Sequence, residues 1–285
     1  MIRRLFTAIA ALILSCGLSS VGASDTHPTH DPVPGGIALV PIPPDTTTAQ
    51  RPPKVHFRGR RVMVLGPREQ DNAAWVAVIG IPLSTAPGEY TLDVHFASSA
   101  GKKITFPVFD KAYQEQHITL SNKRQVNPEK RDLQRIGREK KQMTHAFQHW
   151  TDTDRATAQM LWPLQGQISS PFGLKRFFTE PRAPHSGLDI AAPEGTPVRA
   201  PASARVVVSG DFFFNGQTLI LDHGHGLITM YCHLSRIEVA AGVRVSPGQT
   251  IGLVGKTGRA TGPHLHWSVS LNDARINPYL LMPPP

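Results

Sequence analysis

Hydrophobic and polar positions alternate along much of this chain, which predicts a mainly β protein. Short apolar or alternating runs lie at residues 61–65, 75–79, 90–96 and 103–108, and turn residues such as Pro87 and Gly88 separate them. Runs of this length with such separators are typical of antiparallel strands. We therefore expect an N-terminal β-sandwich, immunoglobulin-like in a broad sense, over residues 54–120.

The pattern changes to a helical period between residues 126 and 160. Asn127 suits an N-cap, and Pro128 suits the first helical position. The apolar residues that recur every three or four positions are Leu133, Ile136, Met143, Phe147 and Trp150. One face is thus apolar and the other carries Lys, Arg and Glu, which predicts a linking helix that packs along a flanking domain.

Strands punctuated by Gly and Pro return over residues 161–280 and predict a second, all-β domain. The expected strands are residues 205–209, 217–221, 227–233, 250–254 and 264–270. Ahead of both domains, residues 24–53 are rich in Pro, Thr and His and predict a disordered leader, within which residues 37–40 could add an edge strand. A length of 285 residues agrees with two domains plus accessory segments.

Residues 1–23 have the pattern of a secretory signal peptide. Arg3 and Arg4 precede an apolar stretch, and the small residues at 21–23 form a cleavage site after Ala23. We therefore expect an exported protein. The alternative is lipidation at Cys16, which would tie the protein to a membrane; otherwise no membrane attachment is expected. Cleavage after Ala23 leaves Cys232 without a disulfide partner, and Cys232 is expected to be a small buried apolar residue.

The formal net charge of +9, which falls by two if Arg3 and Arg4 are removed, favours anionic partners. We expect no nucleic-acid binding, because the protein is predicted to be exported and no basic cluster is interleaved with stacking aromatics. An anionic cell-wall or membrane surface fits better. Nothing in the sequence specifies an oligomeric state.

Candidate chemistry is confined to the second domain. His185 and Asp189 stand four residues apart on a segment that Gly187 allows to bend, and His264 and His266 alternate on one predicted strand, so both point to one face. His233 lies at the end of another strand, where it is expected to share a face with Tyr231, opposite Cys232.

Two imidazoles and one carboxylate form a ligand set that suits zinc. Three protein ligands leave the fourth tetrahedral position open, which is typical of catalytic rather than structural zinc. Each motif alone is weak, since His and Asp are also ordinary loop residues. Their joint presence in one domain favours a metal site.

These residues together resemble the lysostaphin-type (LytM-domain) family of zinc peptidoglycan endopeptidases. The resemblance covers residues 162–278. The motifs that carry it are residues 170–173, 185–198, 233–234, 245–249, 255–258 and 264–266.

The resemblance implies roles for five residues. By position, His185, Asp189 and His266 match the zinc ligands, and His264 and His233 match two active-site histidines that do not bind the metal. The implied reaction is attack of zinc-activated water on a peptide carbonyl. His264 would act as general base or position the water, and His233 would help to stabilise the oxyanion. Tyr231 and Arg182 are weaker candidates for stabilising the transition state.

The N-terminal region is similar to that of some proteobacterial members of the family, through residues 106–108 and 136–140. This similarity implies a periplasmic protein that cuts peptide cross-links or stem peptides of peptidoglycan. The N-terminal region could also inhibit the enzyme, either by covering the groove or by supplying a fourth zinc ligand.

Two other functions have to be weighed against the peptidase. A non-catalytic LytM-type activator of a cell-wall amidase would lack metal ligands, whereas this chain has all three. A lipoyl- or biotinyl-type carrier domain would need a modifiable Lys at a hairpin tip, where this chain has His223 and His225. Those two are expected to be exposed turn residues, and His145 and His149 to be surface residues of the helix. The wall of the substrate groove is expected in loops 175–182 and 210–216.

Overall fold

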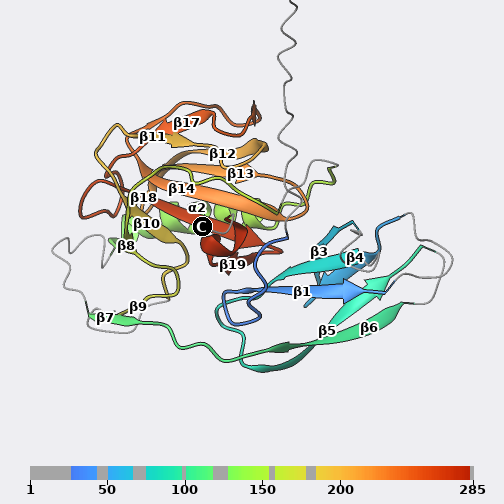
Figure 1. Cartoon of the computed structure of the whole chain (residues 1–285). Helices are drawn as coiled ribbons and strands as arrows, with labels where there is room; N and C mark the ends of the chain where they lie inside the picture. Colours follow the sequence, from blue (N-terminus) through green and yellow to red (C-terminus); the bar gives the residue numbers. More distant parts are fainter. Residues whose placement is uncertain are drawn as a thin grey trace, which may run out of the picture.

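The computed structural model describes residues 27–43, 51–66, 75–97, 101–117, 128–153, 158–177 and 184–282. It consists of two β-rich domains and a helix between them in sequence, which confirms the predicted fold class (Figure 1). Within these ranges no helix is both long and apolar enough to cross a membrane. The predicted signal peptide, Cys16 and Arg182 lie outside the described residues.

The N-terminal domain is one six-stranded antiparallel sheet in the order β1-β4-β3-β2-β5-β6. Its strands are β1 Ile37–Ile42, β2 Lys54–Phe57, β3 Arg60–Leu65, β4 Trp75–Gly80, β5 Gly88–His95 and β6 Lys102–Val108. The start of β3 pairs with β2 and its end pairs with β4, so β3 joins the two halves of the sheet. The halves fold over a common apolar core that includes Val40, Ile79 and Phe106, which gives a sandwich-like layer.

The structure differs from the prediction for residues 24–53, because part of this segment is an ordered strand. Edge strand β1 pairs with β4 over its whole length, and Ile37, Ala38 and Ile42 are fully buried. This is the edge strand that residues 37–40 suggested. The strand has only six residues in a segment rich in Pro and Thr, so its apolar residues show no clear period in the sequence.

The two domains share one core. Ile37, Met63 and Val78 of the N-terminal domain belong to the same buried cluster as Leu271 and Ile276 of the C-terminal domain. Polar groups add to the junction: the Asn272 side chain accepts a hydrogen bond from Gly80 N (2.7 Å) and donates one to Gly80 O (2.9 Å). Gly80 has no side chain to obstruct this contact, since a Cβ there would lie 2.5 Å from Leu271 O.

The C-terminal domain is built on an eight-stranded sheet with the path β16-β12-β13-β14-β18-β10-β8, and β19 pairs with β18. Its strands are β8 Gln167–Ser170, β10 Leu188–Ala191, β12 Ala204–Phe212, β13 Gly216–Asp222, β14 Leu227–Leu234, β16 Arg244–Val245, β18 His264–Leu271 and β19 Ala274–Ile276. A second sheet contains β11 Pro197–Arg199, β17 Thr250–Leu253 and β15 Arg236–Ile237, and a pair contains β7 Glu115–His117 and β9 Lys175–Phe177. A short 3-10 helix, η2 Pro278–Leu281, ends the described chain.

Alternation along the central strands gives the large sheet two different faces. Tyr231 of β14 and Trp267 of β18 are paired and fully buried in the core shared with the N-terminal domain. Met230 and Cys232 point to the other face, where they pack with Phe147 of helix α2 (Lys130–Phe147). Cys232 is 1% exposed, as predicted for a small apolar residue, and burial raises the pKa of its thiol to about 12.

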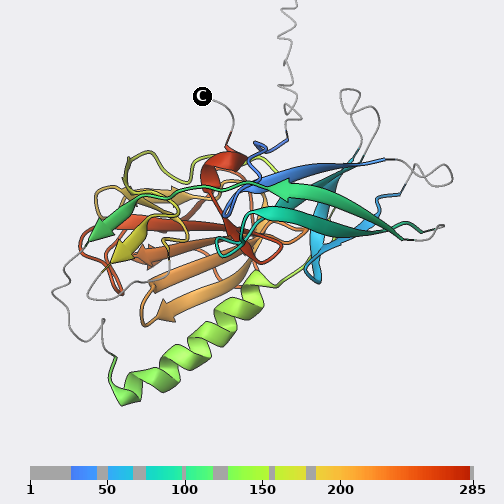
Figure 2. The ribbon, with the colours of Figure 1, turned by 90° about the horizontal axis from the view of Figure 1, so that it is seen from below.

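Helix α2 (Lys130–Phe147) crosses that second face (Figure 2). Its N-cap is Glu129, whose backbone N–H donates to the Asp132 side chain at 3.2 Å. The predicted N-cap, Asn127, lies outside the described residues. Its buried apolar residues, Ala146 and Phe147, lie at its C-terminal end, whereas Leu133 near its start is 55% exposed. The apolar period therefore predicted the helix correctly, but fewer residues of its apolar face are buried than predicted.

Candidate metal centre and active site

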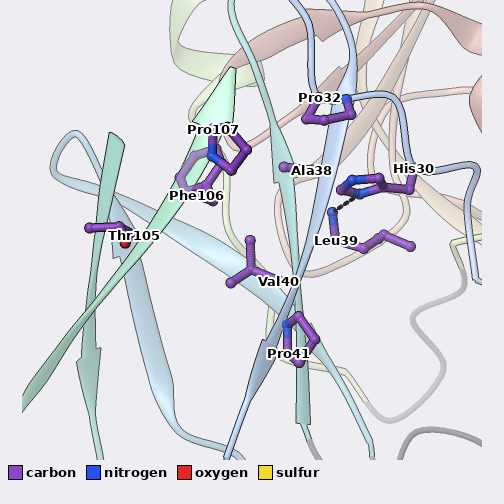
Figure 3. A pocket seen from close by; sticks show the side chains of 9 residues that line it. All are labelled: His30, Pro32, Ala38, Leu39, Val40, Pro41, Thr105, Phe106 and Pro107. Carbon is purple, nitrogen blue, oxygen red and sulfur yellow. Dashed lines mark hydrogen bonds between the residues drawn. The ribbon is translucent and has the colours of Figure 1, made fainter. Parts of the chain in front are cut away.

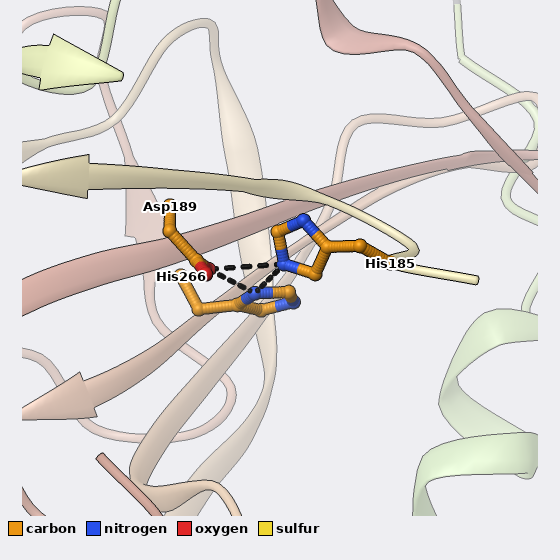
Figure 4. A group of neighbouring side chains, drawn as sticks. All are labelled: His185, Asp189 and His266. Carbon is orange, nitrogen blue, oxygen red and sulfur yellow. Dashed lines mark hydrogen bonds and ion pairs between the residues drawn. The ribbon is translucent and has the colours of Figure 1, made fainter. Parts of the chain in front are cut away.

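His185, Asp189 and His266 meet at one point of the large sheet (Figure 4). His185 precedes β10, Asp189 lies in β10, and His266 lies opposite Asp189 in the neighbouring strand β18. His185 Nε2 lies 3.0 Å from both Asp189 Oδ1 and His266 Nδ1, and His266 Nδ1 lies 2.8 Å from Asp189 Oδ1. The structure thus brings together the three residues that were predicted as ligands.

Partners on the outer side of each imidazole determine where its proton lies. His185 Nδ1 faces Pro171 O at 2.9 Å, and a carbonyl can only accept, so Nδ1 carries the hydrogen. His266 Nε2 faces Ser268 Oγ at 2.9 Å, and the Ser268 hydroxyl donates to Ser186 O, so His266 Nε2 is the donor to Ser268. In the neutral rings, His185 Nε2 and His266 Nδ1 therefore both direct lone pairs toward Asp189 Oδ1.

Three converging lone pairs repel one another unless a cation lies among them. The three ligand atoms are 2.8–3.0 Å apart, and a tetrahedral zinc with bonds of about 2.0–2.1 Å would separate them by about 3.3 Å, so small shifts suffice. Burial lowers the pKa of His266, which keeps the imidazole neutral. This donor set fits a divalent metal.

Gly187 explains why His185 and Asp189 can converge. A Cβ at Gly187 would lie 2.6 Å from Trp267 O, 2.7 Å from Ser268 Oγ and 2.9 Å from His266 Cε1. The chain between the two ligands therefore runs against β18 at a distance that only glycine permits.

His264 and His233 lie beside this centre. His264 Nε2 is 4.0 Å from Asp189 Oδ1, and His264 Nδ1 donates to Gly262 O at 2.8 Å. His233 Nδ1 donates to Thr257 O at 2.8 Å, and the His233 ring centroid is 4.8 Å from that of His264. Each imidazole thus keeps an Nε2 lone pair. Burial and nearby His266 lower the pKa of His233 to about 3.

The predicted face of His233 is wrong. Cys232 pairs with His266, so these two share a face, and the His233 ring lies on that side, 6.3 Å from the His266 ring. The reason is local: His233 has a φ of +63°, and the β13–β14 register shifts between Gln217 and Leu219. The alternation of side chains between the two faces of β14 ends before His233, so it cannot predict the face on which His233 lies.

Sequence reasoning missed the outer partners of the two histidine ligands. Ser268 follows His266 by two positions and therefore lies on the same face of β18. That spacing could have identified Ser268. Pro171 stands within a motif that carried the resemblance, but no sequence signal assigns a role to its carbonyl oxygen.

Histidines at the opposite end of the sheet are structural. His223, predicted to be exposed, is 4% exposed because Nδ1 donates to Ser203 O (3.0 Å) and Nε2 accepts from Thr229 Oγ1 (2.8 Å). His225 stacks on Trp150 with ring centroids 5.6 Å apart. Tyr231 is fully buried in the core, so its weaker candidacy for contact with substrate is not supported.

A cavity of about 220 Å³ lies elsewhere, between β1 and β6 of the N-terminal domain (Figure 3). Its lining is mostly apolar, with His30, whose Nδ1 accepts a hydrogen bond from Leu39 N at 2.9 Å. None of the five predicted site residues lines it. The cavity is therefore separate from the histidine cluster.

Comparison with known proteins identifies the family of this chain. A crystal structure described as that of a peptidase M23 from Pseudomonas aeruginosa superposes with a TM-score of 0.73 at 42% identity, over 88% of this chain and 95% of that one. The chain belongs to peptidase family M23. The family's peptidase model matches residues 183–278, and the model of the M23 N-terminal domain matches residues 30–111.

Two curated M23 relatives are 42% identical over 113 residues, which is 39% of this chain and 26% of each relative. They are the DD-carboxypeptidase/endopeptidase Mpg of Neisseria meningitidis and the peptidoglycan DD-endopeptidase ShyA of Vibrio cholerae. The matched part of the chain thus spans about a quarter of their length. A non-catalytic activator of a cell-wall amidase would lack metal ligands. This chain has all three candidate ligands, so the activator alternative is not favoured.

Proposed function

We propose that this chain is a zinc-dependent endopeptidase that hydrolyses stem peptides or peptide cross-links of bacterial peptidoglycan. The observation that carries the proposal is the convergence of three lone pairs, from His185, Asp189 and His266, beside two further imidazoles. The names of the Mpg and ShyA relatives support peptidoglycan as the substrate.

Zinc in this site would supply a Lewis acid and lower the pKa of water toward neutrality. His185 and His266 would bind through Nε2 and Nδ1, and Asp189 through its carboxylate. The Pro171 carbonyl and the Ser268 hydroxyl would hold the two rings in these tautomers.

Proton transfer falls to His264 and His233. Both donate Nδ1–H to a backbone carbonyl, so both present Nε2 as an acceptor. His264 Nε2 is directed toward the ligand cluster and suits the general base. Because the pKa of His233 is lowered to about 3, His233 can donate to an oxyanion only after it has taken up a proton.

Export to the periplasm belongs to the same proposal. It rests on the signal-peptide pattern of residues 1–23 and on the substrate, which lies outside the cytoplasm.

The test is mass spectrometry of peptidoglycan fragments after incubation with the wild type and with Asp189→Ala. Hydrolysis of each peptide bond consumes one water and leaves a new carboxyl end on one product and a new amino end on the other. We expect such fragments from the wild type and none from Asp189→Ala. Release of intact stem peptides from the sugar, or no release after zinc is added, would contradict the proposal.

A further inference from the structure

The segment that follows β6 connects the N-terminal domain to the neighbourhood of the metal centre. We call residues 109–117 the strap. Near its start the strap is fixed to the N-terminal domain: Phe109 N donates to Pro32 O (2.8 Å), and Lys111 Nζ lies 2.7 Å from Asp31 Oδ2. Farther along, Lys175 N donates to Gln114 O (2.9 Å), and β7 pairs with β9 in parallel (Figure 1).

Tyr113 is the central contact of the strap. Its hydroxyl donates to Pro34 O at 2.7 Å, and its ring meets Phe172 edge to face with centroids 6.2 Å apart. The ring also lies directly against Gly173, where a Cβ would be 2.0 Å from it. Gly173 has a φ of +80°, so a glycine serves both the turn and the close approach.

Phe172 is enclosed from a second direction by the N-terminal domain. It is 5% exposed, and a Cβ on Gly35 would lie 2.5 Å from Phe172 Cε1. The turn at Phe172 and Gly173 is therefore held between Tyr113 of the strap and Gly35, which precedes β1.

The same turn holds His185 by three hydrogen bonds. His185 Nδ1 donates to Pro171 O (2.9 Å), Gly173 N donates to His185 O (2.8 Å), and His185 N donates to Leu174 O (2.9 Å). The main chain and the ring of this candidate ligand are thus both fixed by residues 171–174. The contacts run without a gap from the N-terminal domain, through Tyr113 and the turn, to His185.

We propose that the strap is a positioning element of the metal centre, with Tyr113 as its positioning residue. By ordering residues 171–174, the N-terminal domain holds His185 Nε2 in place before the metal arrives, which lowers the entropic cost of binding. This inference rests on the proposed function for the identity of the metal. It gives the N-terminal domain a supporting role, distinct from inhibition by covering the groove.

The test uses the full chain and two measurements: zinc affinity by competition with a chelator, and hydrogen exchange of the Gly173 amide in the metal-free protein. Loss of an outer partner of a metal ligand typically weakens affinity about 10–100-fold. Tyr113 contacts the turn that holds His185 and does not contact the ligand itself. We therefore expect Tyr113→Ala to weaken zinc binding about tenfold, at the low end of that range, and to speed hydrogen exchange of the Gly173 amide. Tyr113→Phe, which keeps the ring, should stay close to the wild type.

Tyr90→Ala is the matched control. Tyr90 is also a partly buried tyrosine of the N-terminal region, its hydroxyl donates to Ala86 O (2.8 Å), and its ring contacts Phe57 and Phe106. It should lower stability without changing zinc affinity. Should Tyr113→Ala not fold, Lys111→Gln loosens the strap at its partly exposed ion pair, and a several-fold loss of zinc affinity is expected.

Unchanged zinc affinity in Tyr113→Ala would overturn the strap proposal, and so would an equal loss in Tyr90→Ala. A wild type that binds no zinc would instead contradict the proposed function. In that case hydrogen exchange of the Gly173 amide still tests whether the strap orders residues 171–174. Faster exchange in Tyr113→Ala supports this ordering, and unchanged exchange overturns it.

Discussion

The two ends of the large sheet both carry histidines and a buried aspartate, yet only one end has the chemistry of a metal site. At the end with Asp222, His149 Nδ1 pairs with the carboxylate (2.9 Å), and both nitrogens of His223 have partners. At the end with Asp189, outer partners take one nitrogen of each ligand imidazole and leave the other directed inward. Convergence of inward-directed lone pairs, rather than residue type, therefore distinguishes a metal site from a structural cluster.

The largest expected effect comes from removing an acceptor at the metal end. His264→Ala should lower the rate of peptidoglycan cleavage about 10²–10⁴-fold, the range typical of general base catalysis, because the acceptor Nε2 is lost. Zinc content should stay near that of the wild type, since His264 is not one of the three converging ligands.

Metal analysis and fragment release, measured on the same preparation, check this prediction. His225→Ala, at the opposite end of the sheet, is the control and should keep both zinc and activity. Loss of zinc from His264→Ala would show that the division between ligands and proton carriers is wrong.

A second prediction concerns the pH dependence of stability at the opposite end. Burial lowers the pKa of His223 to about 4 from an unfolded value of 6.5. Between these values the unfolded chain holds a proton that the folded chain does not, so stability is present above pH 6.5 and is lost as the pH falls toward 4. The expected loss is about 3 kcal/mol.

Urea denaturation of the wild type and of His223→Asn at pH 7 and pH 4 measures this loss. The variant should show a smaller difference between the two pH values, because it lacks the titrating imidazole. Equal pH dependence in both proteins would mean that His223 is not held neutral by burial.

The smallest expected effect concerns the outer partner of His266. Ser268→Ala removes the acceptor that fixes the His266 tautomer and should weaken zinc binding by about tenfold. Ser270→Ala is the matched control, since Ser270 lies on the same strand, is equally buried and contacts Arg275 instead. Chelator competition measures the zinc affinity of the two variants. Equal affinities would show that Ser268 does not support His266 in zinc binding.

Much of this architecture follows from short-range patterns. Period-two alternation predicted the strands and placed His264 and His266 on one face, and the three-and-four spacing predicted α2. These predictions succeed because one face of each element is buried, so the sequence carries a repeat.

Features without a local signal were not predicted. The left-handed φ of His233 depends on a register shift against β13, and the β7–β9 pair joins segments about 60 residues apart. His223 is buried by Ser203 and Thr229, which a turn-like sequence does not reveal. The predicted boundaries of the domains and the catalytic roles of the histidines stay predictions.

The central claim is that His185, Asp189 and His266 hold a zinc ion, and the metal content of the reconstituted protein tests it most directly. Wild type and His266→Ala are incubated with zinc, dialysed and analysed by mass spectrometry for metal per chain. The account predicts one zinc per wild-type chain and none in His266→Ala. A wild type without zinc, or equal zinc in both proteins, would contradict it.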